Sequence, residues 1–327
     1  MEALKLAAID LGTVSSRLLC ATVRDGVIVD ARKHTVITDL GEGVDASGVF
    51  ATTAVERVVS ACRVFIDEAQ SYGASCVCTT LTSAARDVSN GEELLRPLCE
   101  LGLIPQVISG EIEARLTFYG VAHDFPGHRI AVADSGGGST EIVIGSYAGD
   151  GGFDLTRSES LNIGCRRVTE RFFESLPPSQ AEIDAAVSWM RPQLEAYWAD
   201  VEVQPDRLIA VGGTVTSLVA MVHELRVYDS QFVHLRDLTL AEVERAIRTM
   251  SLLGVEGIAA LPGIQAKRAP VIFAGSLVIR ELMRAGGYER LTVSENSLLA
   301  GAAATVYEAM TSEAVPAIGW RPDVSSI

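Results

Sequence analysis

The sequence has 327 residues, 48% of them apolar, and its 27 basic and 42 acidic side chains give a formal net charge of −15. A chain of this length is longer than a domain with a single hydrophobic core usually is, so it predicts two domains of roughly 120 to 180 residues each. The negative charge argues against nucleic acid or an anionic membrane as a partner, because both need a broad basic surface. An anionic ligand would therefore depend on local arginines and a metal ion.

The N-terminal sequence Met1-Glu2-Ala3-Leu4-Lys5 leads directly into an apolar run and does not resemble a signal peptide. No apolar stretch reaches the ~18 residues that a membrane span requires. We therefore expect a cytoplasmic protein. Its six cysteines lack the spacing of metal ligands, so we expect reduced thiols and no zinc site.

The first predicted element is a hairpin. Residues 6–11 are largely apolar and predict a strand with Asp10 near its end, and residues 15–19, which end in Leu18 and Leu19, predict a second strand. The turn at residues 12–15 combines a glycine with hydroxyl side chains, so its backbone amides can approach an anion.

Strands and helices alternate through the rest of the first half. In chain order we predict a strand at 27–37, a helix at 53–69, a strand at 74–81, a strand at 104–108 and a helix at 109–121. Thr53 and Glu56 predict a capping box, and Ser109 can cap the second helix. Arg86 follows the strand at 74–81, at the edge where α/β sheets place ligands.

A turn of three glycines is the most informative feature of the chain. Residues 130–135 and 140–144 predict strands around the glycines at 136–138, with Asp134 and Glu141 at either end. The amides of such a turn can bind phosphate, and the two acids can hold a divalent cation against it. A Walker loop or a dinucleotide fingerprint would lead into a helix, whereas a strand follows here. The repeated pattern predicts two related halves.

The second half continues with further helices. We predict a helix at 180–198 that begins with a capping box of Ser179 and Glu182, a strand at 208–211, and helices at 240–253, 270–284 and 294–310. The strand at 208–211 ends in Gly-Gly-Thr before a helix, which is a third place where amides can meet an anion.

Six motifs, in this order and spacing, resemble the exopolyphosphatase and guanosine pentaphosphate phosphohydrolase family (Ppx/GppA) of the actin and sugar-kinase superfamily. They are Asp-Leu-Gly at 10–12, Thr-Ser-Ala-Ala-Arg-Asp at 82–87, Ser-Gly-Glu-Ile-Glu-Ala-Arg-Leu at 109–116, Gly-Gly-Gly-Ser-Thr-Glu at 136–141, Gly-Gly-Thr at 212–214, and Leu-Pro-Gly at 261–263 followed by Lys-Arg-Ala at 267–269. The resemblance covers nearly the whole chain.

The resemblance implies an α/β fold of two actin-like (ribonuclease H-like) domains with a cleft between them. We place the N-terminal domain at residues 1–122, with the C-terminal helix able to pack back on it, and the C-terminal domain at 123–310. Residues 311–327 contain prolines and serines, and we expect them to form a flexible tail.

Hydrolysis of a phosphoanhydride needs an in-line water, a group that orients and deprotonates it, and positive charge on the phosphoryl oxygens. The resemblance gives the role of catalytic base to Glu113, which precedes Ala-Arg-Leu. Glu111 lies two residues earlier, so the two side chains point in different directions on a helix and only one is expected to enter the cleft. From the residues alone, both acids could simply complement the positive end of that helix.

The resemblance also implies Mg²⁺, with Mn²⁺ as the alternative, held by Asp134 and Glu141 and within reach of Asp10. From the residues alone, Asp10 and Asp134 could instead cap their turns. The phosphate-binding residues that the resemblance implies are loop residues and two arginines: Gly12, Thr13, Ser15, Arg86, Gly136, Gly137, Gly138, Ser139, Gly213, Thr214 and Arg268. Secondary basic candidates are Arg17, Arg166 and Arg167.

The chain departs from the family pattern at several points. The first turn reads Thr13-Val14-Ser15 where the family has Ser-Asn-Ser, and Ser135 replaces an apolar residue. Near the end, the family's Ser-Asp-x-Gly-Leu-Arg-Glu-Gly appears as Ser-Glu-Asn-Ser-Leu-Leu-Ala-Gly at 294–301, which puts Leu299 in the place of an arginine. The proposed catalytic and metal-binding acids remain, so we expect an active enzyme with altered substrate contacts.

The leading prediction is an exopolyphosphatase that releases terminal orthophosphate from inorganic polyphosphate. The first alternative is a guanosine pentaphosphate 5′-phosphohydrolase. Longer family members carry further C-terminal domains that the printed sequence does not contain, so we expect short chains or a nucleotide to be preferred.

Two alternatives belong to other classes. A regulator that binds guanosine tetra- or pentaphosphate with little turnover would fit the changes at Val14 and Leu299. A kinase or chaperone-like ATPase would use Gly212-Gly213-Thr214 as an adenosine site, and the Glu113 motif argues against it. Homodimers are common among relatives, so a homodimer is an open alternative. The metal identity and the chain-length preference are not fixed by sequence.

Overall fold

The computed structural model describes residues 3–149 and 152–327, so Met1 and Glu2 of the predicted N-terminal run lie outside the described residues. The chain divides into two compact units. Unit 1 comprises Met1–Pro126, Tyr147–Phe153 and Asn296–Ile327, and unit 2 comprises Gly127–Ser146 and Asp154–Glu295. The chain first passes from unit 1 to unit 2 after Pro126, close to the predicted boundary at 122/123. It then returns to unit 1 twice, at Tyr147–Phe153 and at Asn296–Ile327.

Unit 1 is built on one mixed sheet. Its elements are β1 (Leu4–Leu11), β2 (Ser15–Arg24), β3 (Val27–Ile37), α1 (Val44–Ser47), α2 (Thr52–Tyr72), β4 (Cys76–Leu81), α3 (Ser83–Arg86), α4 (Glu92–Glu100), β5 (Pro105–Val107), α5 (Gly110–Ala122), α13 (Leu298–Thr311) and β12 (Ser325–Ser326). The first three strands are antiparallel, and β4 and β5 run parallel to β1, in the order β3-β2-β1-β4-β5. Strand β12 pairs with the other end of β4.

Unit 2 repeats this topology. Its elements are β6 (Arg129–Ser135), β7 (Thr140–Tyr147), β8 (Phe153–Leu161), α6 (Cys165–Phe172), α7 (Gln180–Ala199), β9 (Arg207–Val211), α8 (Gly213–Val222), α9 (Ser230–Val233), β10 (Arg236–Thr239), α10 (Leu240–Met250), α11 (Val255–Ala259), η1 (Ala266–Arg268), α12 (Ala269–Ala285) and β11 (Arg290–Val293). The order β8-β7-β6-β9-β11 matches that of unit 1, with β10 added at the edge. This shared order confirms the predicted α/β class with two related actin-like halves.

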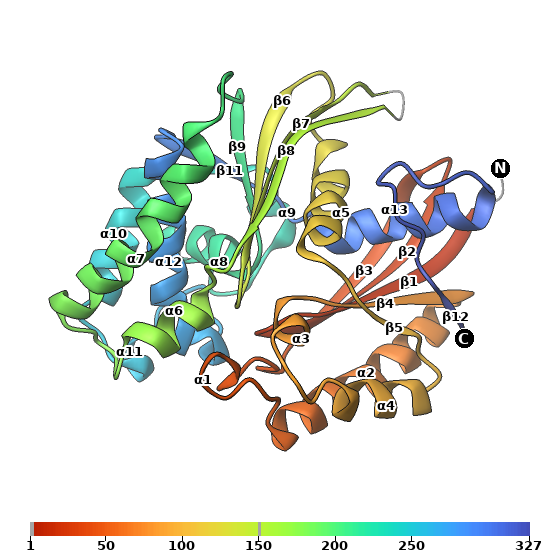
Figure 1. Ribbon diagram of the computed structural model, residues 1–327, viewed down its shortest axis with the longest axis horizontal. Helices are drawn as coiled ribbons and strands as arrows, with labels where there is room; N and C mark the ends of the chain where they lie inside the picture. The colour runs from red at the N-terminus through yellow and green to blue at the C-terminus, as the bar shows by residue number, and fades with distance from the viewer. Residues whose placement is uncertain (1–2, 150–151) are drawn as a thin grey trace. The chain divides into compact units, whose positions relative to one another are not determined.

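The central strands β1 and β4 of the unit 1 sheet are buried on both faces. Ala7, Ile9 and Leu11 pack toward α2 and α4, whereas Leu6 and Ala8 pack toward α5 and α13. A continuous apolar strand is typical of a sheet covered on both sides. Figure 1 shows α13, in blue, beside α5 and the red strands β1–β3, although α13 and these strands lie near opposite ends of the sequence. Asp10 shares the face of Leu6 and Ala8 because side chains alternate along a strand.

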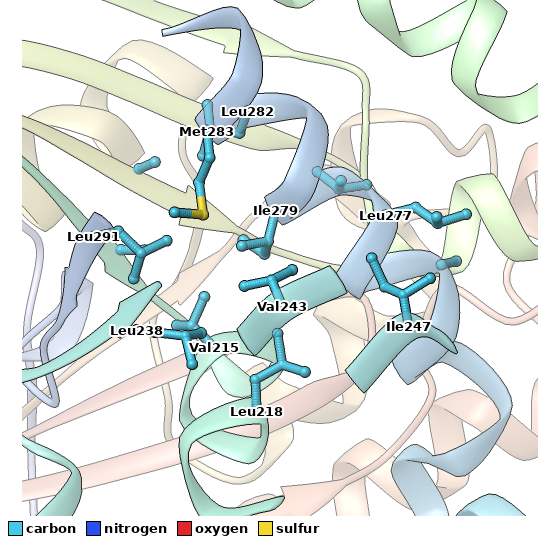
Figure 2. Packing of buried hydrophobic residues seen from close by; sticks show 14 of the residues in the cluster. Val215, Leu218, Leu238, Val243, Ile247, Leu277, Ile279, Leu282, Met283 and Leu291 are labelled. Carbon is cyan, nitrogen blue, oxygen red and sulfur yellow. The ribbon is translucent and has the colours of Figure 1, made fainter. Parts of the chain in front are cut away.

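The core of unit 2 lies between one face of its sheet and a layer of helices that includes α7, α8, α10 and α12. Figure 2 shows Val215 and Leu218 of α8 among the apolar side chains of α10, α12, β10 and β11. Leu277 of α12 and Val243 of α10 are fully buried in this cluster. The cluster supports the segment that carries the Gly-Gly-Thr turn.

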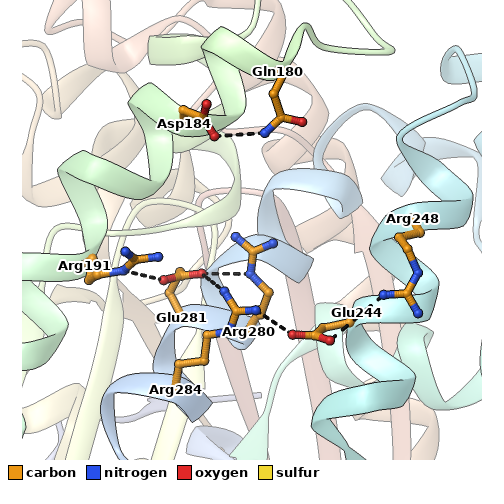
Figure 3. Close-up of polar contacts among 8 residues, drawn as sticks. All are labelled: Gln180, Asp184, Arg191, Glu244, Arg248, Arg280, Glu281 and Arg284. Atoms are coloured by element: carbon orange, nitrogen blue, oxygen red, sulfur yellow. Dashed lines mark hydrogen bonds and ion pairs between the residues drawn. The ribbon is translucent and has the colours of Figure 1, made fainter.

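An ion network around one buried carboxylate also holds the helices of unit 2 together. Glu281 on α12 is 1% exposed and accepts hydrogen bonds from Arg191 of α7 (3.0 Å), Arg280 (2.8 Å) and Arg284 (3.3 Å). Arg284 continues to Glu244 of α10 at 2.6 Å (Figure 3). Three guanidinium groups compensate the desolvation of one buried carboxylate, so the network fixes α7 and α10 against α12.

The predicted helix starts differ in outcome. Ser109 accepts a hydrogen bond from the amide of Ile112, and Ser179 forms the predicted capping box with Glu182, so both predictions are confirmed. The predicted capping box at Thr53 is wrong, because α2 already begins at Thr52 after Ala51 and has no side-chain cap. Thr53 therefore lies inside the first turn, where its hydroxyl does not serve as the cap.

Three other predicted bounds were too long. The helix predicted at 294–310 begins at Leu298, the helix predicted at 240–253 ends at Met250, and the strand predicted at 104–108 is reduced to β5. Residues 294–297 form a loop that connects the two units in the chain.

The C-terminal segment differs from the expected flexible tail. Ser325 pairs with Val77 of β4, and Gln106 exchanges two hydrogen bonds of 3.0 Å with Asp323. Arg115 of α5 donates to the carbonyl of Ile318 at 3.2 Å. These partners lie more than 200 positions away in the sequence, so the local composition of the tail gave no sign of them.

Candidate active site

The first hairpin places Asp10 opposite Arg17. Asp10 is 1% exposed, and its Oδ2 accepts hydrogen bonds from Nε (2.9 Å) and Nη2 (2.5 Å) of Arg17. Its Oδ1 is buried and has no hydrogen-bond partner among residues 3–149 and 152–327. The arginine therefore pairs with this carboxylate through Oδ2, and Oδ1 keeps an unused capacity to accept a hydrogen bond.

Backbone amides donate hydrogen bonds to the carbonyl groups of this hairpin's turn. Gly12 donates to the carbonyl of Ser15 at 3.1 Å, and the carbonyl of Thr13 accepts from the amide of Gly41 at 2.8 Å. The carbonyl of Val14 accepts from the amide of Asp39 at 2.9 Å. The Val14 side chain, which stands where the family has an asparagine, is 5% exposed and therefore packs inward.

Glu113 and Arg86 form a close pair within unit 1. Glu113 lies in the first turn of α5 and is 7% exposed. Its Oε2 accepts a hydrogen bond of 2.7 Å from Nη1 of Arg86, which also donates to the carbonyl of Ile108 at 3.0 Å. Arg86 ends α3, directly after β4. The sequence predicted a phosphate-binding role for Arg86 but not this pairing.

The two acids of α5 have different surroundings, as their spacing predicts. The Glu111 side chain is 65% exposed and pairs with Arg115 one turn later at 2.6 Å. Such an exposed pair is typical of a solvated helix surface. Of the two acids, only Glu113 lies in a buried polar setting that can orient a reactant.

The triple-glycine hairpin of unit 2 brings two acids together. Asp134 and Glu141 are directly opposite in the β6–β7 register, so their side chains share one face of the sheet. Both are buried, with exposures of 5% and 2%. Glu141 Oε1 accepts hydrogen bonds of 2.7 Å from Ser139 and from Ser160 of β8.

The two hairpins share a backbone pattern but differ in charge. Gly136 donates to the carbonyl of Ser139 at 2.9 Å, which repeats the contact of Gly12 in unit 1. The residue opposite the aspartate is an arginine in unit 1 and a glutamate in unit 2. Like charges so close in a buried site repel one another, and a bound cation relieves that repulsion.

The β9–α8 turn lies against the same hairpin. Gly212 has a φ of +99°, and a Cβ there would come 3.1 Å from Oδ1 of Asp134. A Cβ on Gly213 would overlap the guanidinium of Arg268, so this arginine packs directly on the start of α8. Thr214 is 4% exposed. The structure thus joins Asp134, the Gly-Gly-Thr turn and Arg268 in unit 2.

The donor set fits a hard divalent cation. Asp134 and Glu141 offer carboxylate oxygens, and Mg²⁺ commonly takes one or two carboxylates and completes its shell with water and phosphate oxygens. Across residues 3–149 and 152–327 no group of three or more His, Cys, Asp or Glu side chains is placed to hold a metal ion.

Cys165 begins α6 next to the triple-glycine turn but is not an activated nucleophile. Burial raises the pKa of its thiol above the usual value of 9.0, and this effect outweighs the nearby Arg268 and Arg166, which lower it. The thiol therefore stays protonated at neutral pH. The remaining chemistry of the hairpin is that of carboxylates, amides and water.

Sequence reasoning missed two contacts at this site. Ser160 was not singled out, although the alternation of Ser158 and Ser160 in a third strand beside the hairpin is a signal for a polar sheet face. Arg167 was assigned only to a basic lining, whereas its Nε donates to the carbonyl of Gly138 at 2.8 Å. Ser135, a departure from the family pattern, is buried, and its hydroxyl has no partner within the described residues.

Two repeated sheets, each with a glycine hairpin that carries a buried aspartate, define an α/β protein of two related actin-like halves. The chain belongs to the Ppx/GppA phosphatase family, whose model matches residues 19–306. It is 34% identical over 320 residues to Exopolyphosphatase 2 of Mycobacterium tuberculosis, covering 93% of this chain and 98% of that protein. It is 29% identical to a guanosine-5′-triphosphate,3′-diphosphate pyrophosphatase of Pseudoalteromonas translucida, covering 90% of this chain but 57% of that protein.

Solved structures agree with this assignment. The crystal structure of an exopolyphosphatase-like protein superposes with a TM-score of 0.85 at 29% identity, covering 93% of this chain and 98% of that one. The Ppx/GppA family member of Aquifex aeolicus superposes with a TM-score of 0.77 at 28% identity, covering 95% of this chain and 100% of that one.

Among the helices of the described residues, none has both the length and the apolar character needed to cross a membrane.

Proposed function

We propose that this protein is a metal-dependent exopolyphosphatase that releases terminal orthophosphate from inorganic polyphosphate in the cytoplasm. The observation that carries the proposal is the juxtaposition of Asp134 and Glu141 at the triple-glycine turn, where two buried acids adjoin backbone amides. Carboxylates that share a cation, together with amides, are a typical means of holding a phosphoryl group. The likeness to Exopolyphosphatase 2 over nearly its whole length supports polyphosphate as the substrate.

In this proposal Asp134 and Glu141 hold Mg²⁺, or Mn²⁺ as the alternative. The bound cation would withdraw charge from the phosphoryl oxygens and so make the phosphorus more open to attack. Asp10 is the weaker ligand candidate, because Arg17 occupies one of its oxygens. The unpartnered Oδ1 of Asp10 is suited to accept a hydrogen bond from a water.

Glu113 is proposed to accept a proton from the attacking water. Arg86 keeps this carboxylate in one orientation through the 2.7 Å hydrogen bond. The phosphate oxygens would bind amides and hydroxyls of the two turns, at Gly12, Thr13, Ser15 and Gly136 to Ser139, together with Gly213, Thr214 and Arg268.

The alternative substrate is guanosine pentaphosphate, supported by the match to the pyrophosphatase of Pseudoalteromonas translucida. The shared phosphoanhydride chemistry does not separate the two substrates. Because the chain spans little more than half of that relative and nearly all of Exopolyphosphatase 2, polyphosphate is the stronger candidate.

A phosphate-release assay with short polyphosphate, long polyphosphate, guanosine pentaphosphate and ATP in the presence of Mg²⁺ tests the proposal. We expect orthophosphate from polyphosphate at a rate that exceeds that from ATP. Release from guanosine pentaphosphate alone would replace the proposal with its alternative. Tight binding of guanosine pentaphosphate without release from any substrate would instead identify a regulator.

A further inference from the structure

The three carbonyl groups of the triple-glycine turn all face α6. The carbonyl of Gly136 accepts from the amide of Cys165 at 3.0 Å, and that of Gly137 accepts from the amides of Arg166 (2.9 Å) and Arg167 (3.2 Å). The carbonyl of Gly138 accepts from Nε of Arg167 at 2.8 Å. The start of α6 thus supplies a donor to each peptide of the turn.

The orientation of these carbonyls fixes that of the amides. In a trans peptide the N–H points opposite to the C=O. The amides of residues 137, 138 and 139 therefore point away from α6. Gly137 and Gly138 are buried, yet no hydrogen bond from either amide is found in residues 3–149 or 152–327. Buried donors without a partner are unfavourable, so this face of the turn is prepared for an acceptor such as a phosphate oxygen.

Close packing keeps α6 in register with the turn. A Cβ at Gly164, directly before α6, would overlap the carbonyl carbon and oxygen of Gly137. The backbone of α6 therefore contacts the backbone of the turn without an intervening side chain. Most of the resulting hydrogen bonds join backbone to backbone, whereas the one to Gly138 depends on the side chain of Arg167.

In unit 1 the equivalent carbonyl accepts hydrogen bonds from backbone amides. There the carbonyl of Val14, which corresponds to Gly138, accepts from the amides of Thr38 (3.1 Å) and Asp39 (2.9 Å). Unit 2 replaces these neutral donors with a guanidinium. Its charge adds to the positive end of the α6 dipole and strengthens the attraction of the turn for an anion.

We infer that Arg167 is a positioning residue: it orients the peptide between Gly138 and Ser139 so that the Ser139 amide faces the bound phosphate. This inference rests on the proposed role of the turn as a phosphate site. Arg167 acts from behind the turn and does not itself touch the substrate.

The test compares Arg167→Met and Arg167→Lys with Arg171→Met. Arg171 lies on the same helix, is exposed and stacks over Trp189, with its guanidinium carbon 4.8 Å from the ring centroid. Arg167→Met should lower kcat/KM for polyphosphate by about tenfold to a hundredfold, the loss expected for one charge-assisted hydrogen bond. Arg167→Lys keeps the charge without the rigid fork and should recover part of this loss. Arg171→Met should stay within about twofold of the wild type.

A second measurement separates positioning from a general loss of structure. Inorganic phosphate with Mg²⁺ is titrated into isotope-labelled protein, and the amide resonances of residues 137 to 139 are followed. In the wild type all three should shift, and in Arg167→Met the Ser139 shift should be lost while the thermal unfolding midpoint stays close to that of Arg171→Met.

Wild-type kcat/KM and an unchanged Ser139 shift in Arg167→Met would overturn the inference. If that variant fails to fold, Arg167→Lys decides by the same two readouts, and equality with the wild type in both would overturn the inference. Failure of the wild type to release phosphate from any substrate would refute the proposed function instead. The phosphate titration would still report on Arg167 in that case.

Discussion

Arg86 and Glu113, which lie 27 positions apart in the sequence, are joined by a hydrogen bond of 2.7 Å between Nη1 and Oε2. The same nitrogen also donates to the carbonyl of Ile108, just before α5. The arginine therefore ties the end of β4 to the start of the helix that carries the proposed base. Its principal effect in this structure is to orient Glu113, and a contact to phosphate would be additional.

Replacing Arg86 should therefore lower kcat more than it raises KM. Arg86→Lys retains the charge but loses the fixed geometry of the guanidinium, and we expect kcat to fall about tenfold; Arg86→Met should cost about a hundredfold. Steady-state kinetics with polyphosphate separate the two parameters. Arg96→Lys, at an exposed position of α4, is the control. A rise in KM with unchanged kcat would show that Arg86 serves only to bind substrate.

Removal of the divalent cation should abolish phosphate release, because two buried acids would then face an anionic substrate without a counter-charge. Asp134→Asn removes one proposed ligand and should raise the Mg²⁺ concentration that gives half-maximal activity by at least about tenfold. Asp154→Asn, at an exposed position of β8, should leave that concentration unchanged. Full activity in excess chelator would exclude the metal site.

The hairpins and their acids could be predicted from sequence because they depend on neighbouring residues. Asp134 and Glu141 are seven positions apart, and the turn between two apolar runs fixes their register. Side-chain alternation then places both acids on one face of the sheet. Local helix geometry likewise predicted that the side chains of Glu111 and Glu113 point in different directions.

Contacts between distant segments could not be predicted in this way. The Arg86–Glu113 pair, the Arg167 contact to Gly138 and the pairing of β12 with β4 each depend on how whole elements pack. The position of Leu299 is a further example, because this replacement of an arginine lies in the apolar core around α5 and α13. The departure from the family pattern suggested altered substrate contacts there, whereas the structure shows that Leu299 packs in the core.

The crossing of α5 and α13 leaves no room for a side chain at Gly301. A Cβ at this position would overlap the carbonyl oxygen of Leu116, and one at Gly120 would overlap that of Ser297. Gly301→Ala should therefore lower the free energy of unfolding by about 1–3 kcal/mol, as expected for overpacking. Denaturant unfolding measures this change against Thr311→Ala at the exposed end of the same helix. Equal stability of the two variants would contradict the expected overpacking at Gly301.

The capping box of α7 predicts a dependence of stability on pH. The amide of Glu174 and the hydroxyl and amide of Ser179 donate to Glu182, and these hydrogen bonds hold its pKa below the usual value of 4.5. Because the folded-state pKa is the lower one, the carboxylate stabilises the fold above pH 4.5, and this contribution is lost as the pH falls through the folded-state pKa.

Glu182→Gln removes that contribution. The difference in unfolding free energy between the wild type and Glu182→Gln should therefore be present at neutral pH and shrink on acidification below 4.5. Urea unfolding at a series of pH values measures it, with Glu195→Gln at an exposed position of α7 as the charge-matched control. A difference that is constant across the series would refute the role of the capping carboxylate.

The most direct test of the central claim is single-turnover hydrolysis of short polyphosphate by Glu113→Gln beside Glu111→Gln. Both variants remove one carboxylate from the first turn of α5, but only Glu113 is buried against Arg86. We predict that Glu113→Gln slows orthophosphate release by about 10²–10⁴-fold while substrate still binds, and that Glu111→Gln reacts at the wild-type rate. Release by Glu113→Gln at the wild-type rate would contradict the assignment of Glu113 as the base.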